Sequence, residues 1–182
     1  QEKKDIQRDL KKAKVMTLTV GGNDVIHVIK DNITNLNVAT FTKPAQAYQK
    51  RLGQIIELAR KDNKTLPIYI VGIYNPFYLN FPEMTEMQTI VDNWNQSTEE
   101  VCKEYDNVYF VPVNDLLYKG IDGKDGVTSS DDTSQSSKSS QDSLNDALFE
   151  DDHFHPNNTG YQIMSDAILK RINQTKKEWS GE

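Results

Sequence analysis

Three short apolar runs along the chain predict the strands of one sheet. They cover residues 15–20, 67–74 and 108–111, and they are rich in β-branched and aromatic side chains. The runs are mostly β-branched or apolar rather than alternating with charged residues, which is typical of strands that are covered on both faces. The first run ends at Gly21-Gly22 and the second at Asn75-Pro76, both of which are loop signals.

Helical spacing of apolar residues fills the segments between these runs. Residues 44–62 begin with Pro44, which suits a first helical turn, and they carry an apolar stripe that predicts an amphipathic helix. The same spacing predicts further helices over 3–14, 24–32, 83–105 and 159–173. Because strands and helices alternate, we expect parallel strands joined by right-handed crossovers, and therefore an α/β fold.

Composition and charge narrow the class of protein. The 182 residues suffice for a single domain with a sizeable core. A net charge of −6 argues against a nucleic-acid partner, since no basic stripe is present to neutralise phosphates. Cys102 is the only cysteine, so neither an internal disulfide nor a cysteine-based metal cage can form, and its helical spacing predicts a buried core thiol.

A polar segment interrupts the pattern before the last helix. Residues 128–143 contain eight serines in sixteen positions and no apolar side chain. Such a stretch cannot bury surface, so we expect a mobile Ser/Asp-rich insert over about residues 120–146 of the single domain. A phosphorylation site or a partner-binding segment is the alternative interpretation of this composition.

Candidate chemistry gathers in residues 150–161, where acidic and imidazole side chains run directly into the last predicted helix. Within this stretch, Asp152 stands three residues before His155. A carboxylate at that spacing can accept a hydrogen bond from one ring nitrogen, which fixes the tautomer and leaves the other nitrogen to take a proton. We therefore expect an oxygen of Asp152 at ~2.7–3.2 Å from a ring nitrogen of His155.

Two further loops are expected beside this pair, because the carboxyl ends of parallel strands meet at one edge of a sheet. In the loop after the first strand, Gly21 and Gly22 allow a sharp turn, and Asn23 offers an amide donor suited to an oxyanion. The loop after the second strand carries aromatic side chains that could line an acyl pocket or cap the core. Its pocket candidates are Tyr74, Asn75 and Phe77, with Tyr78 and Phe81 nearby.

These two motifs together carry a family resemblance. Gly21-x-Asn23-Asp24 after a buried strand, with Asp152-x-x-His155-Pro156-Asn157 before the last helix, resembles the SGNH (GDSL-type) esterases and lipases, and most of all their bacterial lipase/acylhydrolase branch. The matches extend over residues 17–24 and 152–161, and the resemblance covers nearly the whole chain except the insert.

The resemblance implies a flavodoxin-like three-layer α/β/α fold. It also implies that His155 is the general base, that Asp152 orients it, and that Asn23 is an oxyanion donor supported by Gly21, Gly22 and Asp24. The implied substrate is a small-molecule or lipid ester, and no cofactor is implied.

The chain departs from the family at the nucleophile. The family's serine lies in a Gly-Asp-Ser-Leu-like block, and a second block supplies a glycine N–H to the oxyanion hole; neither block occurs here. The chain therefore resembles the C-terminal portion of such an enzyme, without its first two strands, and we expect it to be inactive alone. It also lacks an initiating methionine and a signal-peptide pattern, which is expected of part of a longer protein.

Other interpretations of the same residues stay open. His153 and His155, with the neighbouring carboxylates, could form a metal site, although His27 is the only other histidine. A non-catalytic fragment that keeps the pocket is the alternative from another functional class.

The absence of the strand that carries the nucleophile in this family leads to expectations about the partners of the chain and its cellular location. Without that strand, residues 15–20 would form an open sheet edge that pairs with the missing N-terminal segment or with a second copy. An export or membrane segment in the absent portion would place the protein outside the cytoplasm, and these residues do not distinguish that location from a cytoplasmic one.

Overall fold

The computed structural model describes residues 2–31, 37–121 and 145–181. Its elements, in chain order, are α1 (Glu2–Lys12), β1 (Met16–Thr19), α2 (Gly22–Asp31), the 3-10 helix η1 (Val38–Phe41), α3 (Thr42–Ala59), β2 (Ile68–Val71), α4 (Thr85–Lys103), β3 (Val108–Val111), α5 (Asn114–Leu117) and α6 (Asn158–Trp179). The Ser-rich residues 128–143 lie outside the described residues, so the structure does not address the predicted insert there.

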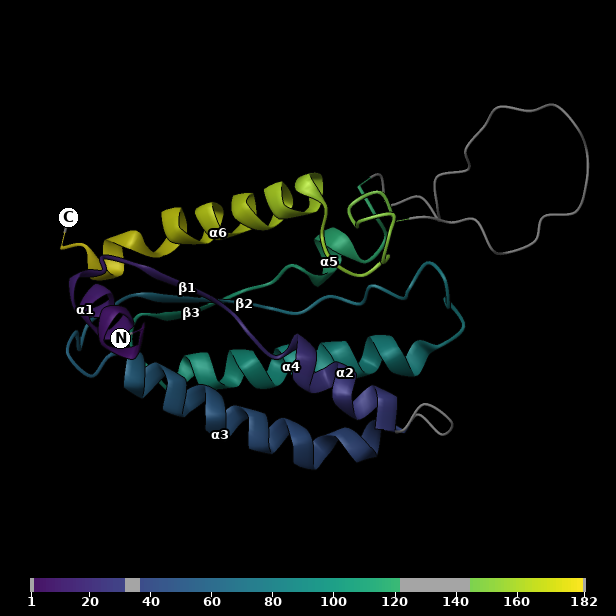
Figure 1. The fold of residues 1–182 in the computed structure, drawn as a ribbon, viewed down its shortest axis with the longest axis horizontal. Coiled ribbons are helices and arrows are strands. Elements are labelled where there is room, and N and C mark those ends of the chain that lie inside the picture. Colours follow the sequence, from purple (N-terminus) through teal and green to yellow (C-terminus); the bar gives the residue numbers. More distant parts are fainter. Residues whose placement is uncertain (1, 32–36, 122–144, 182) are drawn as a thin grey trace, which may run out of the picture.

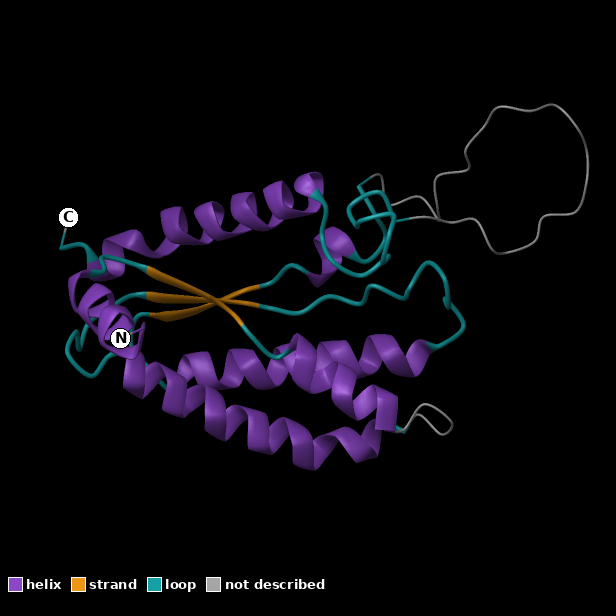
Figure 2. Ribbon diagram, in the orientation of Figure 1, coloured by secondary structure: helices purple, strands orange, loops and turns teal. Residues whose placement is uncertain are grey.

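The three strands form a parallel sheet in the order β1-β2-β3, as the alternation of strands and helices predicts. Their register is even: Met16 is opposite Ile68, and Ile68 is opposite Val108. Helices lie on both sides of this sheet. In Figures 1 and 2, α5 and α6 lie above the strands and α2, α3 and α4 lie below them, which gives the expected three-layer α/β/α arrangement.

Two apolar clusters hold these layers together. Ile68 and Ile70 of β2 join a cluster with α2, α3 and α4, whereas Tyr69 and Val71 join a second cluster with α5 and α6. All four residues are buried, because β2 is the central strand and has helices on both faces. Burial of this kind stabilises the fold by about 25 cal/mol per Å² of apolar surface.

The prediction that every strand is covered on both faces is wrong for β1, because this strand lies at the sheet edge and is covered less completely than its neighbours. Its residues alternate between half-buried and exposed, and the exposed ones are Thr17 and Thr19. They pair in register with Tyr69 and Val71, so they share the face of the sheet that packs against α6. In the described part of the chain, β1 has a strand neighbour on one side only.

Helix α6 extends beyond its predicted end. We expected it to end near residue 173, whereas it continues to Trp179. The hydroxyl of Tyr69 lies 2.6 Å from that of Thr175 and accepts a hydrogen bond from Nε1 of Trp179 at 3.0 Å. This contact with the sheet holds two further turns of helix whose own pattern is mostly polar.

The first turn of α6 buries a glycine and not its aromatic neighbour. Tyr161 is exposed. Gly160 takes the buried position instead, because the helix approaches the backbone of Ala147 too closely for a side chain.

Candidate functional site

The stretch that carries Asp152 and His155 is anchored to the start of α6. Asn157 caps the helix by accepting a hydrogen bond from the Gly160 amide at 3.0 Å. Its side-chain nitrogen donates to the carbonyl oxygens of Asp146 at 2.8 Å and Leu148 at 3.0 Å. One side chain therefore fixes the preceding loop to the helix. Asn suits this position because its amide can both accept and donate hydrogen bonds.

The loop folds back on itself between residues 149 and 155. The amide of Phe149 donates to the carbonyl oxygen of His155 at 2.9 Å, and the amide of His153 donates to that of Phe149 at 2.8 Å. His153 has a left-handed backbone conformation, with φ of +50°. This reversal turns the following amides back toward Asp152.

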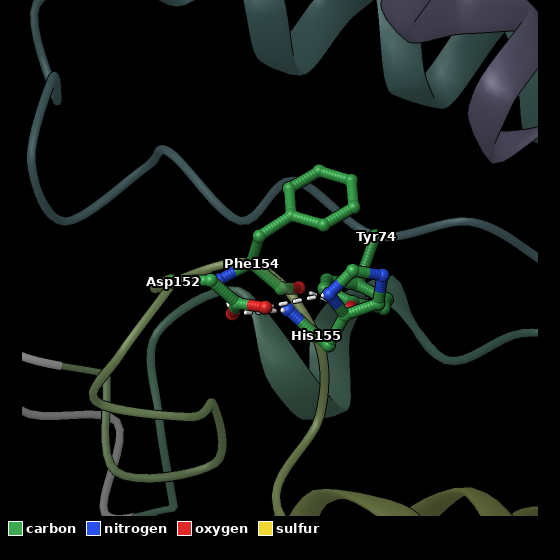
Figure 3. Close-up of polar contacts among 4 residues, drawn as sticks. All are labelled: Tyr74, Asp152, Phe154 and His155. Carbon is green, nitrogen blue, oxygen red and sulfur yellow. Dashed lines mark hydrogen bonds and ion pairs between the residues drawn. The ribbon is translucent and has the colours of Figure 1, made fainter.

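Asp152 and His155 form the predicted hydrogen bond, which Figure 3 shows. Oδ2 of Asp152 lies 2.7 Å from Nδ1 of His155. Oδ1 of the same carboxylate accepts hydrogen bonds from the amides of Phe154 at 2.9 Å and His155 at 3.0 Å. Both oxygens of Asp152 are thus engaged within its own turn.

These contacts determine the charge and tautomer of the pair. The hydrogen bond from the His155 side chain, with those from the backbone amides of His155 and Phe154, lowers the pKa of Asp152 to about 2. Because an ionised carboxylate only accepts hydrogen bonds, Nδ1 of His155 carries a hydrogen, and in the neutral imidazole Nε2 keeps its lone pair. Nε2 points away from Asp152 in Figure 3. The arrangement can therefore accept a proton at Nε2.

Tyr74 connects this loop to the loop after β2. Its hydroxyl donates a hydrogen bond to the carbonyl oxygen of Phe154 at 2.6 Å. Burial raises the pKa of Tyr74, so the hydroxyl stays protonated and remains a donor. The ring of Phe77 lies 6.0 Å from that of Phe154 and adds an aromatic contact between the two loops.

A small, mainly apolar hollow of about 30 Å³ lies where the three predicted loops approach one another. Its lining combines Gly22 and apolar residues of α2, the loop after β2, α4 and Phe154; the set is Gly22, Val25, Ile26, Ile29, Ile73, Tyr74, Asn75, Pro76, Phe77, Met87, Val91 and Phe154. The sequence pattern thus identified the loops that converge here. All three pocket candidates, Tyr74, Asn75 and Phe77, line the hollow.

Asn75 contributes to this site mainly by shaping the loop. Asn75 is buried, and its side-chain oxygen accepts a hydrogen bond from the Phe77 amide at 3.0 Å. Its side-chain nitrogen donates to Gln88 at 3.2 Å, and its backbone amide donates to Asn114 at 2.9 Å. Both ends of the amide therefore have protein partners.

The two glycines in the loop after β1 have different surroundings. Gly21 has φ of +104°, and a Cβ there would lie 3.0 Å from both Trp94 Nε1 and the Tyr48 hydroxyl. Gly21 thus faces the packed core beside α3 and α4, and it is Gly22 that lines the hollow. The expected close approach of backbone to a ligand is therefore available at the second glycine.

Asn23 and Asp24 follow in the first turn of α2. Asn23 is exposed, and Asp24 forms an ion pair with Arg51 of α3 at 2.5 Å. This ion pair ties the turn to a neighbouring helix. Asn23 and His155 do not line the hollow themselves, whereas their chain neighbours Gly22 and Phe154 do. A common cleft for the two side chains remains a prediction.

The other residues singled out in the sequence have local partners. Tyr78 packs edge-on against Tyr118 with ring centroids 4.7 Å apart, and Phe81 is exposed. His27 lies 3.6 Å from Asp31 within α2. Cys102 is buried as predicted, and burial raises the pKa of its thiol to about 12.

The metal interpretation receives no geometric support from the side chains that can be placed. Within residues 2–31, 37–121 and 145–181, no three His, Cys, Asp or Glu side chains are grouped so that they could hold an ion. Nδ1 of His155 is hydrogen-bonded to Asp152.

The sequence pattern did not predict the position of Phe154 beside the hollow or the hydrogen bond made by the Tyr74 hydroxyl. Phe154 provides a ring to the hollow and a carbonyl acceptor to Tyr74. Its position between two histidines in an acidic stretch gives no periodic signal of burial. Only the three-dimensional approach of two loops, 80 residues apart in sequence, identifies the contact.

Comparison with known proteins adds a family and a fold. The sequence model of the GDSL-like lipase/acylhydrolase family matches residues 2–163. The chain is 31% identical over 175 residues to the uncharacterized protein YpmR of Bacillus subtilis (strain 168), covering 96% of this chain but 58% of YpmR. The chain thus spans little more than half the length of this relative.

A solved structure is similar over most of the chain. The crystal structure of the lipase Lip_vut3 from a goat rumen metagenome superposes with a TM-score of 0.66 at 18% identity, covering 91% of this chain and 67% of that one. At this identity the similarity supports the α/β fold.

Proposed function

Because the chain belongs to the GDSL-like lipase/acylhydrolase family, we propose that it provides the general base, its orienting carboxylate and an oxyanion donor of a carboxylic-ester hydrolase. The observation that carries this proposal is the 2.7 Å hydrogen bond between Asp152 and His155, placed directly before α6. The ionised carboxylate and the lone pair on Nε2 are what a base that activates a hydroxyl requires.

In this mechanism a serine hydroxyl attacks the ester carbonyl while Nε2 of His155 removes its proton. The oxyanion that forms on the carbonyl oxygen is stabilised by the side-chain amide of Asn23. His155 then donates the proton to the leaving alcohol, which leaves an acyl-serine. Water attacks this acyl group with His155 again acting as base, and the carboxylic acid and the free serine are regenerated. Asp152 stabilises the imidazolium in both steps.

We propose that the serine comes from a segment absent from this chain. Ser97 and Ser165 lie within α4 and α6, and Ser180 caps the end of α6. No serine among the described residues follows a strand of the sheet, where a nucleophile of this family would lie. On this proposal the 182-residue chain alone is inactive.

The apolar hollow suggests how the acyl part of the ester is held. Its lining of aliphatic and aromatic side chains, such as Ile73 and Phe77, suits a hydrocarbon rather than a charged group. We propose an ester of a lipid or of an acetylated sugar, with only the end of its acyl group reaching the hollow, whose volume of about 30 Å³ is far below that of an ordinary ligand pocket.

The open side of β1 supports the same arrangement. An edge strand presents unpaired N–H and C=O groups that favour pairing with another strand. Thr17 and Thr19 are exposed on a sheet face that is elsewhere covered by α6. The segment that carries the serine is proposed to pair with β1; in its absence, a second copy of the chain would occupy the same edge.

The lack of a placed nucleophile also favours a second function from another class. In this alternative the chain is a binding or scaffold fragment that keeps the hollow and does no chemistry. The two functions differ in whether catalysis depends on His155.

Hydrolysis of p-nitrophenyl acetate by the full-length protein that contains this chain distinguishes them. His155→Ala is expected to lower the turnover number by roughly 10³-fold or more, since loss of a triad member removes most of the catalysis. His27→Ala is the matched control, because His27 is exposed on α2 and belongs to no proposed step. Equal activity of the His155→Ala variant and the unsubstituted protein would reject the hydrolase mechanism.

Among the described residues, no helix is both long enough and apolar enough to cross a bilayer.

A further inference from the structure

The tip of the Asp152–His155 loop projects from its anchor on α6. The side chains of Asp152 and His155 are 43% and 62% exposed. Asn157 and Gly160 fix the base of the loop, whereas the tip is held by its own turn and by contacts from the loop after β2. The direction in which the His155 imidazole presents Nε2 therefore depends on the turn itself and on the contacts from the loop after β2.

The Tyr74 hydroxyl makes its contact at one particular peptide. It donates to the carbonyl oxygen of Phe154 at 2.6 Å, and the N–H of that same peptide, on His155, donates to Oδ1 of Asp152 at 3.0 Å. Oδ2 of Asp152 then accepts from Nδ1 of His155 at 2.7 Å. The four groups form one continuous chain of hydrogen bonds from a tyrosine hydroxyl to the imidazole.

Hydrogen bonds in such a chain strengthen one another. A donor on a peptide carbonyl polarises the amide and makes its N–H a better donor. Here that N–H serves the carboxylate that orients the imidazole. The same bond also fixes the plane of the 154–155 peptide, so it limits the rotation of the backbone that carries the ring.

We propose that Tyr74 is a positioning residue for the Asp152–His155 pair, acting through the peptide between Phe154 and His155. This inference rests on the proposed function, because it assigns a purpose to the orientation of His155. Tyr74 stands after β2, so it couples the imidazole to the sheet and not only to α6. Asn75 and Asn114 in turn hold the Tyr74 loop, since the Asn75 amide donates to Asn114 at 2.9 Å.

Tyr74→Phe tests the proposal, since it removes the hydroxyl and keeps the ring. In the isotopically labelled full-length protein, the carboxyl of Asp152 is expected to titrate with its midpoint raised toward the ordinary value of an aspartate. The His155 amide hydrogen is expected to exchange with solvent roughly 3- to 30-fold faster. Without the Tyr74 hydroxyl on its carbonyl, the 154–155 peptide is less polarised, and its N–H forms a weaker hydrogen bond to Asp152. Tyr78→Phe is the matched control, because Tyr78 lies in the same loop and packs against Tyr118.

Two results would overturn the proposal. One is a Tyr74→Phe protein in which the Asp152 midpoint and His155 amide exchange equal those of the Tyr78→Phe control. The other is acceleration of the Gly160 amide by the same factor as that of His155, which would indicate general loosening of the loop. Because these measurements need no turnover, their failure is distinct from failure of the proposed hydrolase, which the His155→Ala assay tests.

Discussion

Gly160 of α6 packs directly against the carbonyl oxygen of Ala147, and a Cβ at this position would overlap that oxygen. The close approach brings the loop before α6 onto the first turn of the helix. It lets Asn157 reach the carbonyl oxygens of Asp146 and Leu148. The geometry of the Asp152–His155 pair therefore depends on a glycine that takes no part in the chemistry.

Gly160→Ala is expected to destabilise the fold by about 1–3 kcal/mol, the usual cost of forcing extra atoms into a packed space. The obstacle is a backbone oxygen, which cannot move aside as a flexible side chain can. Urea unfolding monitored by tryptophan fluorescence measures the change. Gly22→Ala is the control for stability alone, since a Cβ there meets Ile73 at an ordinary 3.9 Å. An equal effect of both substitutions would contradict the packing argument.

Tyr69→Phe is expected to lower the free energy of unfolding by about 1–3 kcal/mol, because buried Thr175 and half-buried Trp179 each lose a hydrogen bond. The Tyr69 hydroxyl is the link between β2 and the last turns of α6, through Thr175 and Trp179. Tyr161→Phe provides the comparison, as Tyr161 is exposed on the same helix. Thermal unfolding of both variants should separate them, and equal midpoints would show that this link contributes nothing.

The lowered pKa of Asp152 predicts how stability depends on pH. Between the ordinary value of 3.8 and about 2, the unfolded chain binds a proton at this position and the folded chain does not. The contribution of Asp152 is therefore complete above about pH 4 and is lost as the pH falls toward 2. Unfolding measured at several pH values should show a shallower acid decline for Asp152→Asn than for the unsubstituted chain, and parallel curves would contradict the assignment.

The edge position of β1 predicts self-association of the 182-residue chain at micromolar concentration. Thr17→Lys places a charge on the exposed face at this edge, which is expected to disfavour strand pairing and shift the chain toward monomer. Thr65→Lys adds the same charge at an exposed site before β2 and should leave association unchanged. Sedimentation velocity decides between them. A stable monomer for the unsubstituted chain would remove β1 as the pairing surface.

Apolar periodicity was sufficient to predict an α/β fold with parallel strands, because the core-forming elements carry their own signal, whereas the three-layer arrangement was implied by the family resemblance. The bounds of β3 were predicted as they stand, and those of α3 and α4 within three residues. The short α5 and the end of α6 were not predicted. These segments depend on tertiary contacts, such as that between Tyr69 and Thr175, which no local pattern encodes.

The site was predictable to a similar extent. The spacing of Asp152 and His155 within one turn determines their hydrogen bond, so sequence alone was enough. The contact between Tyr74 and Phe154 joins two loops that are distant in sequence, and the orientation of Gly21 toward Trp94 is a packing outcome. Neither follows from residue type or spacing.

Asp152→Asn in the full-length protein is expected to lower the turnover number by roughly 10²–10⁴-fold, because an amide can present the wrong tautomer of His155 to the serine. Asp151→Asn is the matched control, being the adjacent exposed carboxylate. The KM for p-nitrophenyl acetate should change little, since neither side chain lines the hollow. A turnover number for Asp152→Asn equal to that of the control would remove Asp152 from the mechanism.

Fluorophosphonate labelling followed by peptide mapping tests the central proposal most directly, namely that these residues hold the base and its orienter while the nucleophile lies elsewhere. The full-length protein is expected to label stoichiometrically at one serine outside these 182 residues, and His155→Ala should strongly slow that labelling. The 182-residue chain alone should remain unlabelled. Stoichiometric labelling of a serine within the chain, such as Ser165, or labelling of the full-length protein that is indifferent to His155→Ala, would contradict the account.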